Sequence, residues 1–388
     1  MTRSLPDRIA LVHEALPCFG GAERVLETVA DLFPGAPIHT LVHRPSAFVG
    51  TGLAHRDVRT SFIDRIPGAR RHHRLLLPLF PLAVERFDLS AYDLVVSMHY
   101  AAAHGVLTRP DQLHVSYTYT PLRQAWHAHH EYLRSLTRSR RLAARPLLHY
   151  VRLWDRTAAD GVDRFVAISR WIASCIWRAY RRRAQVIYPP VDVEAFAPRG
   201  SREDYYLTVA RLVPHKRVDL IVDAFARIRR PLLVVGEGPE RDRLVDRAPG
   251  NVVFTGRVTD EELAELLGRA RGLVHAAEED FGIALVEAQA AGCPVVAYAG
   301  GGAREIVVDG RTGVLFESRT PEAVGEAVAS LERRPRPRVE DLRQSAERFS
   351  RGRFEREFLR LLETEWEAFR RRGGESSKRR RPASGALS

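Results

Sequence analysis

Short apolar runs and amphipathic stretches alternate along most of this 388-residue chain, and this alternation constrains the fold more than any other feature. An apolar run of about four to eight residues is typical of a buried strand, while apolar residues three and four apart are typical of a helix. Strands that alternate with helices predict parallel sheets that are covered by helices. The expected fold class is therefore α/β.

The strand-like runs form two sets, separated by a polar segment. At 388 residues the chain is also longer than one ordinary core, so two domains are expected. The first set comprises residues 8–14, 38–43, 92–98, 113–119, 164–169 and 185–191, and the second comprises 205–210, 231–238, 251–256, 272–277 and 293–299. We predict two Rossmann-like, doubly wound domains that face a cleft, with ligands beyond the carboxyl ends of the strands.

The domain boundaries follow from these sets. We predict an N-terminal domain over residues 1–192, a linker with Pro and Gly over 193–204 and a C-terminal domain over 205–350. A long helix is expected over 351–372. The basic end of the chain, 373–388, is predicted to be disordered.

The net charge of +12 and the sequence pI of about 10.1 indicate an acidic partner, unless the charge is simply a solvated arginine-rich surface. Residues 69–87 place cations next to an apolar stretch, a pattern that suits the surface of an anionic bilayer. No apolar run reaches the roughly 20 residues that span a membrane, and the N-terminus does not resemble a signal peptide. A cytosolic location is expected.

The three cysteines are too far apart to indicate a disulfide framework or a zinc site.

Glu279 and Glu287 stand out because carboxylates are rarely buried without a partner. Glu279 follows the predicted strand 272–277, so we expect it at a carboxyl end of the sheet. Gly282 begins the next helix, and the amides of Phe281, Gly282 and Ile283 are helix-start donors that suit a phosphate. Glu287 lies one turn further. The two carboxylates can bind the hydroxyls of a sugar and of a ribose, although a helix-start acid and a solvated glutamate would give the same pattern.

Arg211 and Lys216 follow the first strand of the second set. A guanidinium and an ammonium group there can bind a diphosphate and stabilise it as it leaves. In the N-terminal domain, Gly20 and Gly21 form a similar turn before a helix, although a plain tight turn is an equal alternative.

Other motifs are rejected. The chain has no complete Gly-x-Gly-x-x-Gly fingerprint, no kinase catalytic loop before its Asp-Phe-Gly and no Gly-x-Ser-x-Gly elbow. His127, His129 and His130 could bind a metal, but a solvated polar helix is the preferred interpretation.

The Glu279–Glu287 spacing, the preceding "RLVPHK" and the following "GGGAREIVVDGRTGVLFE" resemble the retaining glycosyltransferases of family 4, also called group 1. The resemblance covers most of the chain and is strongest to bacterial mannosyltransferases of O-antigen and exopolysaccharide synthesis. It implies the GT-B architecture, with the helix over 351–372 crossing back to the N-terminal domain.

The resemblance also implies roles for the site residues. Glu287 would bind the donor ribose, and Glu279 would bind the transferred sugar, with backbone contacts from 281–283. Arg211 and Lys216 would bind the diphosphate, and the Gly20–Gly21 turn would lie on its far side. The family needs no metal and no cofactor, and it retains the anomeric configuration without a dedicated nucleophile.

Tyr119 departs from the family pattern, in which a His usually precedes Thr-Pro. A tyrosine can donate a hydrogen bond to a sugar but cannot carry a proton near neutrality. His127 likewise replaces a common Asp. The sequence therefore predicts a hexosyltransferase, with GDP-mannose as donor and a lipid-linked or polysaccharide acceptor, cytoplasmic or peripheral on the inner membrane face, with no nucleic acid partner. A nucleotide-sugar epimerase and a non-catalytic subunit remain alternatives.

Overall fold

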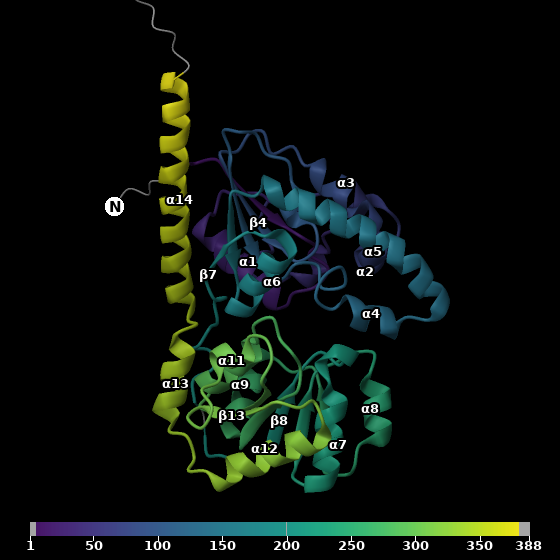
Figure 1. Cartoon of the computed structure of the whole chain (residues 1–388). Coiled ribbons are helices and arrows are strands. Elements are labelled where there is room, and N and C mark those ends of the chain that lie inside the picture. Colours follow the sequence, from purple (N-terminus) through teal and green to yellow (C-terminus); the bar gives the residue numbers. More distant parts are fainter. Residues whose placement is uncertain (1–4, 199, 380–388) are drawn as a thin grey trace, which may run out of the picture. The chain divides into compact units, whose positions relative to one another are not determined.

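The computed structural model describes residues 5–198 and 200–379, with side chains as far as Arg372, and it divides into two compact units (Figure 1). Unit 1 contains the described residues up to Ile168, then 172–187 and the chain from Glu355. Unit 2 contains 169–171 and 188–354. The predicted linker, 193–204, thus lies within unit 2.

Within the described ranges, each unit contains one parallel sheet. The sheet of unit 1 has seven strands in the order β3-β2-β1-β4-β5-β6-β7, and the sheet of unit 2 has six in the order β10-β9-β8-β11-β12-β13. In both sheets the strand order reverses beside the first strand, as in doubly wound folds. The predicted fold class, two Rossmann-like doubly wound domains, is confirmed. The cleft between them stays a prediction.

The elements of unit 1 surround its sheet (Figure 1). Its strands are β1 (Ile9–His13), β2 (Ile38–Thr40), β3 (Val58–Thr60), β4 (Leu94–His99), β5 (Leu113–Thr118), β6 (Arg164–Ala167) and β7 (Ala184–Val186). Its helices are α1 (Gly21–Leu32), α2 (Ala69–His72), α3 (Phe80–Glu85), α4 (His129–Ser135), α5 (Arg138–Ala158), most of α6 (Arg170–Tyr180) and α14 (Arg351–Arg379) from Glu355 on. The strands β1, β4 and β5 are buried along their whole length, which explains their nearly continuous apolar character.

Unit 2 repeats the scheme with shorter connections. Its strands are β8 (Tyr206–Val209), β9 (Leu232–Val235), β10 (Val252–Gly256), β11 (Gly272–His275), β12 (Val295–Tyr298) and β13 (Gly313–Phe316). Its helices are α7 (Val218–Ile228), α8 (Arg241–Arg247), α9 (Asp260–Arg269), α10 (Ile283–Ala290), α11 (Ala303–Ile306), α12 (Pro321–Arg333) and α13 (Val339–Glu347). The core includes Leu232, Val274 and Val296 of the central strands and Phe225 of α7.

Two strands were not predicted from the sequence. The edge strand β3 has only three residues and no apolar run. The strand β13 follows a glycine-rich segment, so the sequence does not show clearly where a helix ends and the strand begins. The run predicted over 185–191 shrinks to β7, which ends before Pro189 and Pro190 because proline cannot donate to a ladder.

Helix α14 ends at Arg379, so residues 373–379, which we expected in the basic tail, are helical. Helix propensity does not explain this extension, because two glycines and two serines stand among its seven residues. The rest of the predicted tail, 380–388, lies outside the described residues. Within unit 1, Phe358 of α14 packs edge-on against Tyr117 of β5, and Glu365 pairs with Arg164 of β6 at 3.0 Å.

Candidate functional site

The loop between β11 and α10 carries the predicted sugar-binding carboxylate. It ends at Gly282, whose φ of 111° is unfavourable for residues with a Cβ atom. The segment after β12 supports the loop, since the amide of Gly302 donates to the carbonyl of Glu279 at 2.8 Å. A Cβ atom at Gly301 would lie 1.9 Å from that same carbonyl oxygen. The glycines of "AGGG" therefore allow two loops at the carboxyl edge of the sheet to touch.

Glu279 is the centre of a small charged cluster. Its Oε1 lies 2.5 Å from Nζ of Lys216 and 2.9 Å from Nε2 of His275. Burial acts to raise the pKa of Glu279, but the charge of Lys216 and the hydrogen bond from His275 outweigh it and hold that pKa well below its usual range. The carboxylate is thus ionised at neutral pH.

Neighbouring strands explain why these residues meet. Lys216 ends the short helix η6 (Pro214–Lys216) after β8, and Glu279 follows β11, which pairs with β8. In a parallel sheet the carboxyl ends of adjacent strands lie at the same edge. The structure therefore brings together two predicted site residues that are 63 positions apart in sequence.

The start of α10 lies next to this cluster in the chain. In the described part of the chain, the amides of Phe281, Gly282 and Ile283 have no recorded intramolecular acceptor, whereas the amide of Leu285 donates to the carbonyl of Gly282 at 3.0 Å. Phe281 is buried and packs against Tyr188. The first amides of a helix of eight residues are suited to an anion.

The structure says less about Arg211 and Glu287. Arg211 is exposed in the loop after β8, and no recorded contact joins it to Lys216 or Glu279. Glu287 lies within α10, one turn after its start, and is buried with 7% of its surface exposed. Their proposed roles stay predictions.

In unit 1, the other predicted residues also meet. Gly20 is the N-cap of α1 and Gly21 is its first residue. The buried Tyr119, which follows β5, donates its hydroxyl hydrogen to the carbonyl of Ala22 at 2.8 Å. Burial raises the pKa of Tyr119 well above its usual value, so the phenol is neutral. Its proton already has an acceptor in this structure.

Sequence reasoning missed His275. It lies four residues before Glu279, and that spacing was the only available signal, since "GLVHAA" otherwise looks like plain buried strand. Sequence reasoning also found no cluster of metal ligands. The fold brings together His99, His104 and Asp155 in unit 1, although Asp155 lies more than 50 residues after the two histidines. Of the histidines considered earlier, His129 lies beside Arg152, with 3.2 Å between Nδ1 and Nη2.

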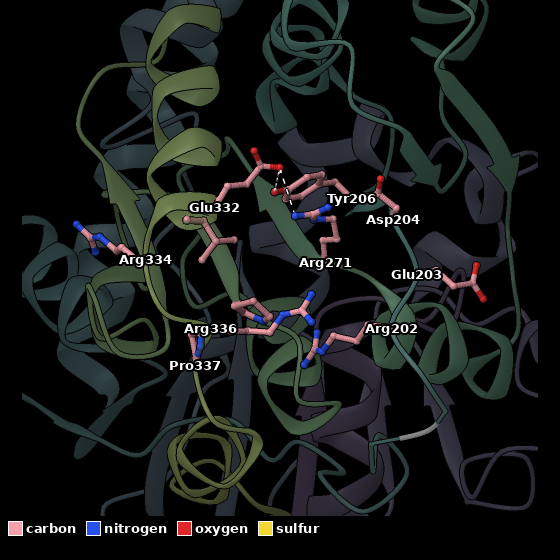
Figure 2. Close-up of a pocket in the computed structure, with 11 residues that line it drawn as sticks. Arg202, Glu203, Asp204, Tyr206, Arg271, Glu332, Arg334, Arg336 and Pro337 are labelled. Carbon is pink, nitrogen blue, oxygen red and sulfur yellow. Dashed lines mark hydrogen bonds and ion pairs between the residues drawn. The ribbon is translucent and has the colours of Figure 1, made fainter.

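A cavity of about 370 Å³ lies elsewhere in unit 2 (Figure 2). It is lined by residues that precede strands, such as Arg271 before β11 and Pro294 before β12, so it opens at the amino edge of the sheet. Some of its polar groups pair with one another: the Tyr206 hydroxyl donates to Glu332 at 3.1 Å, and Arg271 lies 3.8 Å from the same carboxylate. This cavity is therefore separate from the Glu279 cluster.

Residues 194–349, nearly all of unit 2, match the family described as Glycosyl transferases group 1. This part of the chain is a glycosyltransferase group 1 domain. The family that the motifs around Glu279 resembled is thereby confirmed.

Curated relatives of the glycosyltransferase group 1 domain transfer different sugars. The GDP-mannose-dependent alpha-mannosyltransferase of Mycobacterium tuberculosis is 35% identical over 202 residues, which are 48% of this chain and 51% of that protein. The D-rhamnosyltransferase WbpZ of Pseudomonas aeruginosa is 30% identical over 206 residues, 48% of this chain and 54% of its own. The chain spans about half the length of the curated relatives it matches.

A solved structure matches the glycosyltransferase group 1 domain and the rest of the chain together. The structure of Anabaena Alr3699/HepE in complex with UDP-glucose aligns with a TM-score of 0.70 at 18% identity, over 92% of this chain and 100% of that one. At this identity the likeness shows the fold.

Proposed function

We propose that this protein is a retaining hexosyltransferase that transfers mannose from GDP-mannose to a lipid-linked or polysaccharide acceptor. The observation that carries the proposal is the Lys216–Glu279–His275 cluster beside the start of α10, inside a glycosyltransferase group 1 domain. The choice of mannose rests on the mannosyltransferase among the relatives.

The cluster suits a sugar that is joined to a diphosphate. An ionised carboxylate accepts hydrogen bonds from sugar hydroxyls, and the low pKa of Glu279 keeps it ionised. The ammonium group of Lys216 and the amides of 281–283 can together bind the phosphates and stabilise the negative charge that develops as they leave. His275 forms a hydrogen bond with the same carboxylate oxygen, Oε1 of Glu279.

We further propose that no metal takes part in the transfer and that the incoming hydroxyl attacks from the same face that the diphosphate leaves. The positive charge of Lys216, joined by that of Arg211 and by the helix start, supplies the stabilisation that such a departure needs. Glu287 would bind the donor ribose, and the Gly20–Gly21 turn would approach the phosphates.

Purified full-length protein tests this proposal directly. We expect GDP-mannose to raise the melting temperature more than UDP-glucose or UDP-galactose, because a ligand that binds the native state stabilises it. We also expect release of GDP from GDP-mannose to be unaffected by EDTA. Lys216→Ala should lower the rate of release by about 10²- to 10³-fold. Arg227→Ala, which removes an exposed ion pair with Glu322, should preserve it.

Product analysis separates the alternatives. A new glycosidic bond with the donor's anomeric configuration supports retaining transfer. An isomerised sugar nucleotide supports an epimerase, and an inverted product contradicts retention. If neither binding nor turnover of any nucleotide sugar is found, the protein is a non-catalytic subunit.

To reach a lipid-linked acceptor, unit 1 would bind to the cytoplasmic face of an anionic membrane. In the described ranges, no helix has the length and apolar character needed to cross a membrane. The segment 69–87 forms α2, η3 (His73–Leu79) and α3, and it exposes Leu75 to 78% and Leu82 to 52% near Arg70, Arg71 and Arg74. Exposed leucines among arginines suit an interface of anionic headgroups and acyl chains.

Helix α5 adds to this surface. The indole nitrogen of Trp154 donates to Glu85 of α3 at 2.6 Å, so the two helices pack together, and α5 exposes Leu142 to 72%. Co-sedimentation with phosphatidylglycerol vesicles tests the surface. We expect binding that weakens at high salt and in Leu75→Glu, but not in the matched control Val245→Glu on the exposed face of α8. Equal binding to neutral vesicles would contradict it.

A further inference from the structure

Three metal-ligating side chains meet in the core of unit 1, away from every residue used above. His99 ends β4, His104 lies in the turn after it, and Asp155 lies on α5. All three are fully buried, and one ligand atom of each lies within 4.8 Å of the others. Such a group is uncommon in an apolar core, because each polar side chain loses its water there.

The distances among these atoms are close to those of a metal centre. Oδ1 of Asp155 lies 3.4 Å from Nε2 of His104 and 4.0 Å from Nε2 of His99. Ligands at about 2.0–2.2 Å from a tetrahedral zinc ion lie roughly 3.3–3.6 Å apart, so small movements would complete the site. Two further oxygens lie close to these nitrogens: the hydroxyl of Tyr180 is 3.3 Å from Nε2 of His99, and the backbone carbonyl of Asp155 is 3.3 Å from Nε2 of His104.

Hydrogen bonds within the protein leave part of the group unsatisfied. Oδ2 of Asp155 accepts from the indole of Trp126 at 2.6 Å and from the hydroxyl of Tyr180 at 2.9 Å. Its Oδ1, in contrast, is buried without a hydrogen-bond partner. A buried carboxylate oxygen without a partner is unfavourable by about 1–3 kcal/mol or more, and it is the atom that points to a bound cation.

The charges around the group lead to the same conclusion. Glu14, also buried, lies 3.9 Å from Nδ1 of His99, so two carboxylates share this part of the core. In the part of the chain that the structure describes, neither Glu14 nor Asp155 has an ion pair with an arginine or lysine. A bound divalent cation would give both carboxyl groups a partner of opposite charge in this part of the core.

Glu14 has a second role in this arrangement. Its carboxylate accepts hydrogen bonds from the backbone amides of residues 100–103, at 2.5 to 3.3 Å. Burial raises the pKa of Glu14 to about 7, although these amides act to lower it. The amides fix Glu14 beside the turn that carries His104, with its Oε2 3.9 Å from Nδ1 of His99, which is too long for a hydrogen bond.

We propose that His99, His104 and Asp155 bind one divalent transition-metal ion, zinc by preference, as a structural centre of unit 1. The ligands are Nε2 of both imidazoles and Oδ1 of Asp155, with the Tyr180 hydroxyl and the Asp155 carbonyl as neighbouring oxygens. Two nitrogens and an oxygen are a ligand set that zinc accepts. Complete burial excludes a substrate, so the ion joins the turn after β4 to α5 and leaves transfer chemistry to the glycosyltransferase group 1 domain.

Metal analysis of purified full-length protein tests the centre without an activity assay. From zinc-supplemented cells we expect about one zinc per chain by inductively coupled plasma mass spectrometry. Protein produced with cobalt should show the visible d–d bands of a protein-bound ion. Stripping with dipicolinate should lower the melting temperature by several degrees, and added zinc should restore it.

Variants locate the ion. His104→Gln and Asp155→Asn should reduce bound zinc at least tenfold, while the control His39→Gln, at a buried histidine of β2 with no ion pair to a carboxylate in the described residues, should keep it. Another d-block ion at one per chain would still support the centre. Wild-type protein that carries and takes up no metal would overturn it, and so would zinc that remains in both ligand variants. The wild-type measurement decides the matter even where a variant fails to fold.

Discussion

The ammonium nitrogen of Lys216 lies 2.5 Å from Oε1 of Glu279, so the loops after two adjacent strands, β8 and β11, share one ion pair. Both side chains are largely buried, with 22% and 14% of their surfaces exposed. In this ion pair, the ammonium group is available for the phosphates of a ligand, and the carboxylate is available for its hydroxyls. In the proposed reaction Lys216 would contact both the phosphates and Glu279.

Lys216→Ala should lower the rate of transfer by about 10²- to 10³-fold, the effect typical of removing one group that stabilises developing charge. The melting temperature at neutral pH should also fall, because Lys216 is the main group that stabilises the ionised Glu279. Steady-state kinetics with a melting curve measure both. If the variant keeps at least a third of wild-type kcat/KM, Lys216 is not part of the site. Arg227→Ala serves as the control for loss of a surface cation.

Glu279→Gln should show its effect on stability mainly above pH 5. The folded protein lowers the pKa of Glu279 below the unfolded value of about 4.3. A lowered pKa contributes stability that is present above the unfolded pKa and is lost as the pH falls through the folded one. The difference in melting temperature between wild type and Glu279→Gln should therefore be largest near neutrality and shrink from about pH 5 downward. A difference that grows toward low pH would show that the carboxylate is not held ionised.

Gly301→Ala should disrupt the loop that carries Glu279. The new Cβ atom would lie 1.9 Å from the carbonyl oxygen of Glu279, and the φ of 57° at this position adds strain. We expect a loss of about 2 kcal/mol or more in stability and a loss of donor binding, measured by melting curves with and without nucleotide sugar. Gly250→Ala is the matched control, because a Cβ atom there meets nothing within 4 Å.

Tyr119→Phe should reduce stability more than activity. It removes the hydrogen bond to the carbonyl of Ala22 and leaves that acceptor without its partner, which is unfavourable by about 1–3 kcal/mol. Because the hydroxyl proton already has this acceptor, we expect kcat to fall less than tenfold. A loss of more than a hundredfold with unchanged stability would assign Tyr119 a direct role in the reaction.

The α/β fold was predictable because fully buried parallel strands are almost uniformly apolar, as β1 and β4 are. The strand β3 was missed because its three residues at the edge of a sheet contain no such run. The strand β13 is apolar but short, and it was missed because it follows a glycine-rich segment. The extent of α14 was missed because residues 373–379 include two glycines and two serines, which are poor helix formers.

The residue types around Glu279 and their spacing in sequence were enough to show a resemblance to the glycosyltransferases of group 1, and a carboxylate, cations and a helix start suit a sugar diphosphate. The partners of those residues were not contained in that pattern. The pairing of β8 with β11 places Lys216 on Glu279, and the packing of α5 joins His99 and His104 to Asp155, more than 50 residues away. The physical reason is that a parallel sheet gathers loops from distant parts of the chain at one edge, and burial then determines which charges must pair.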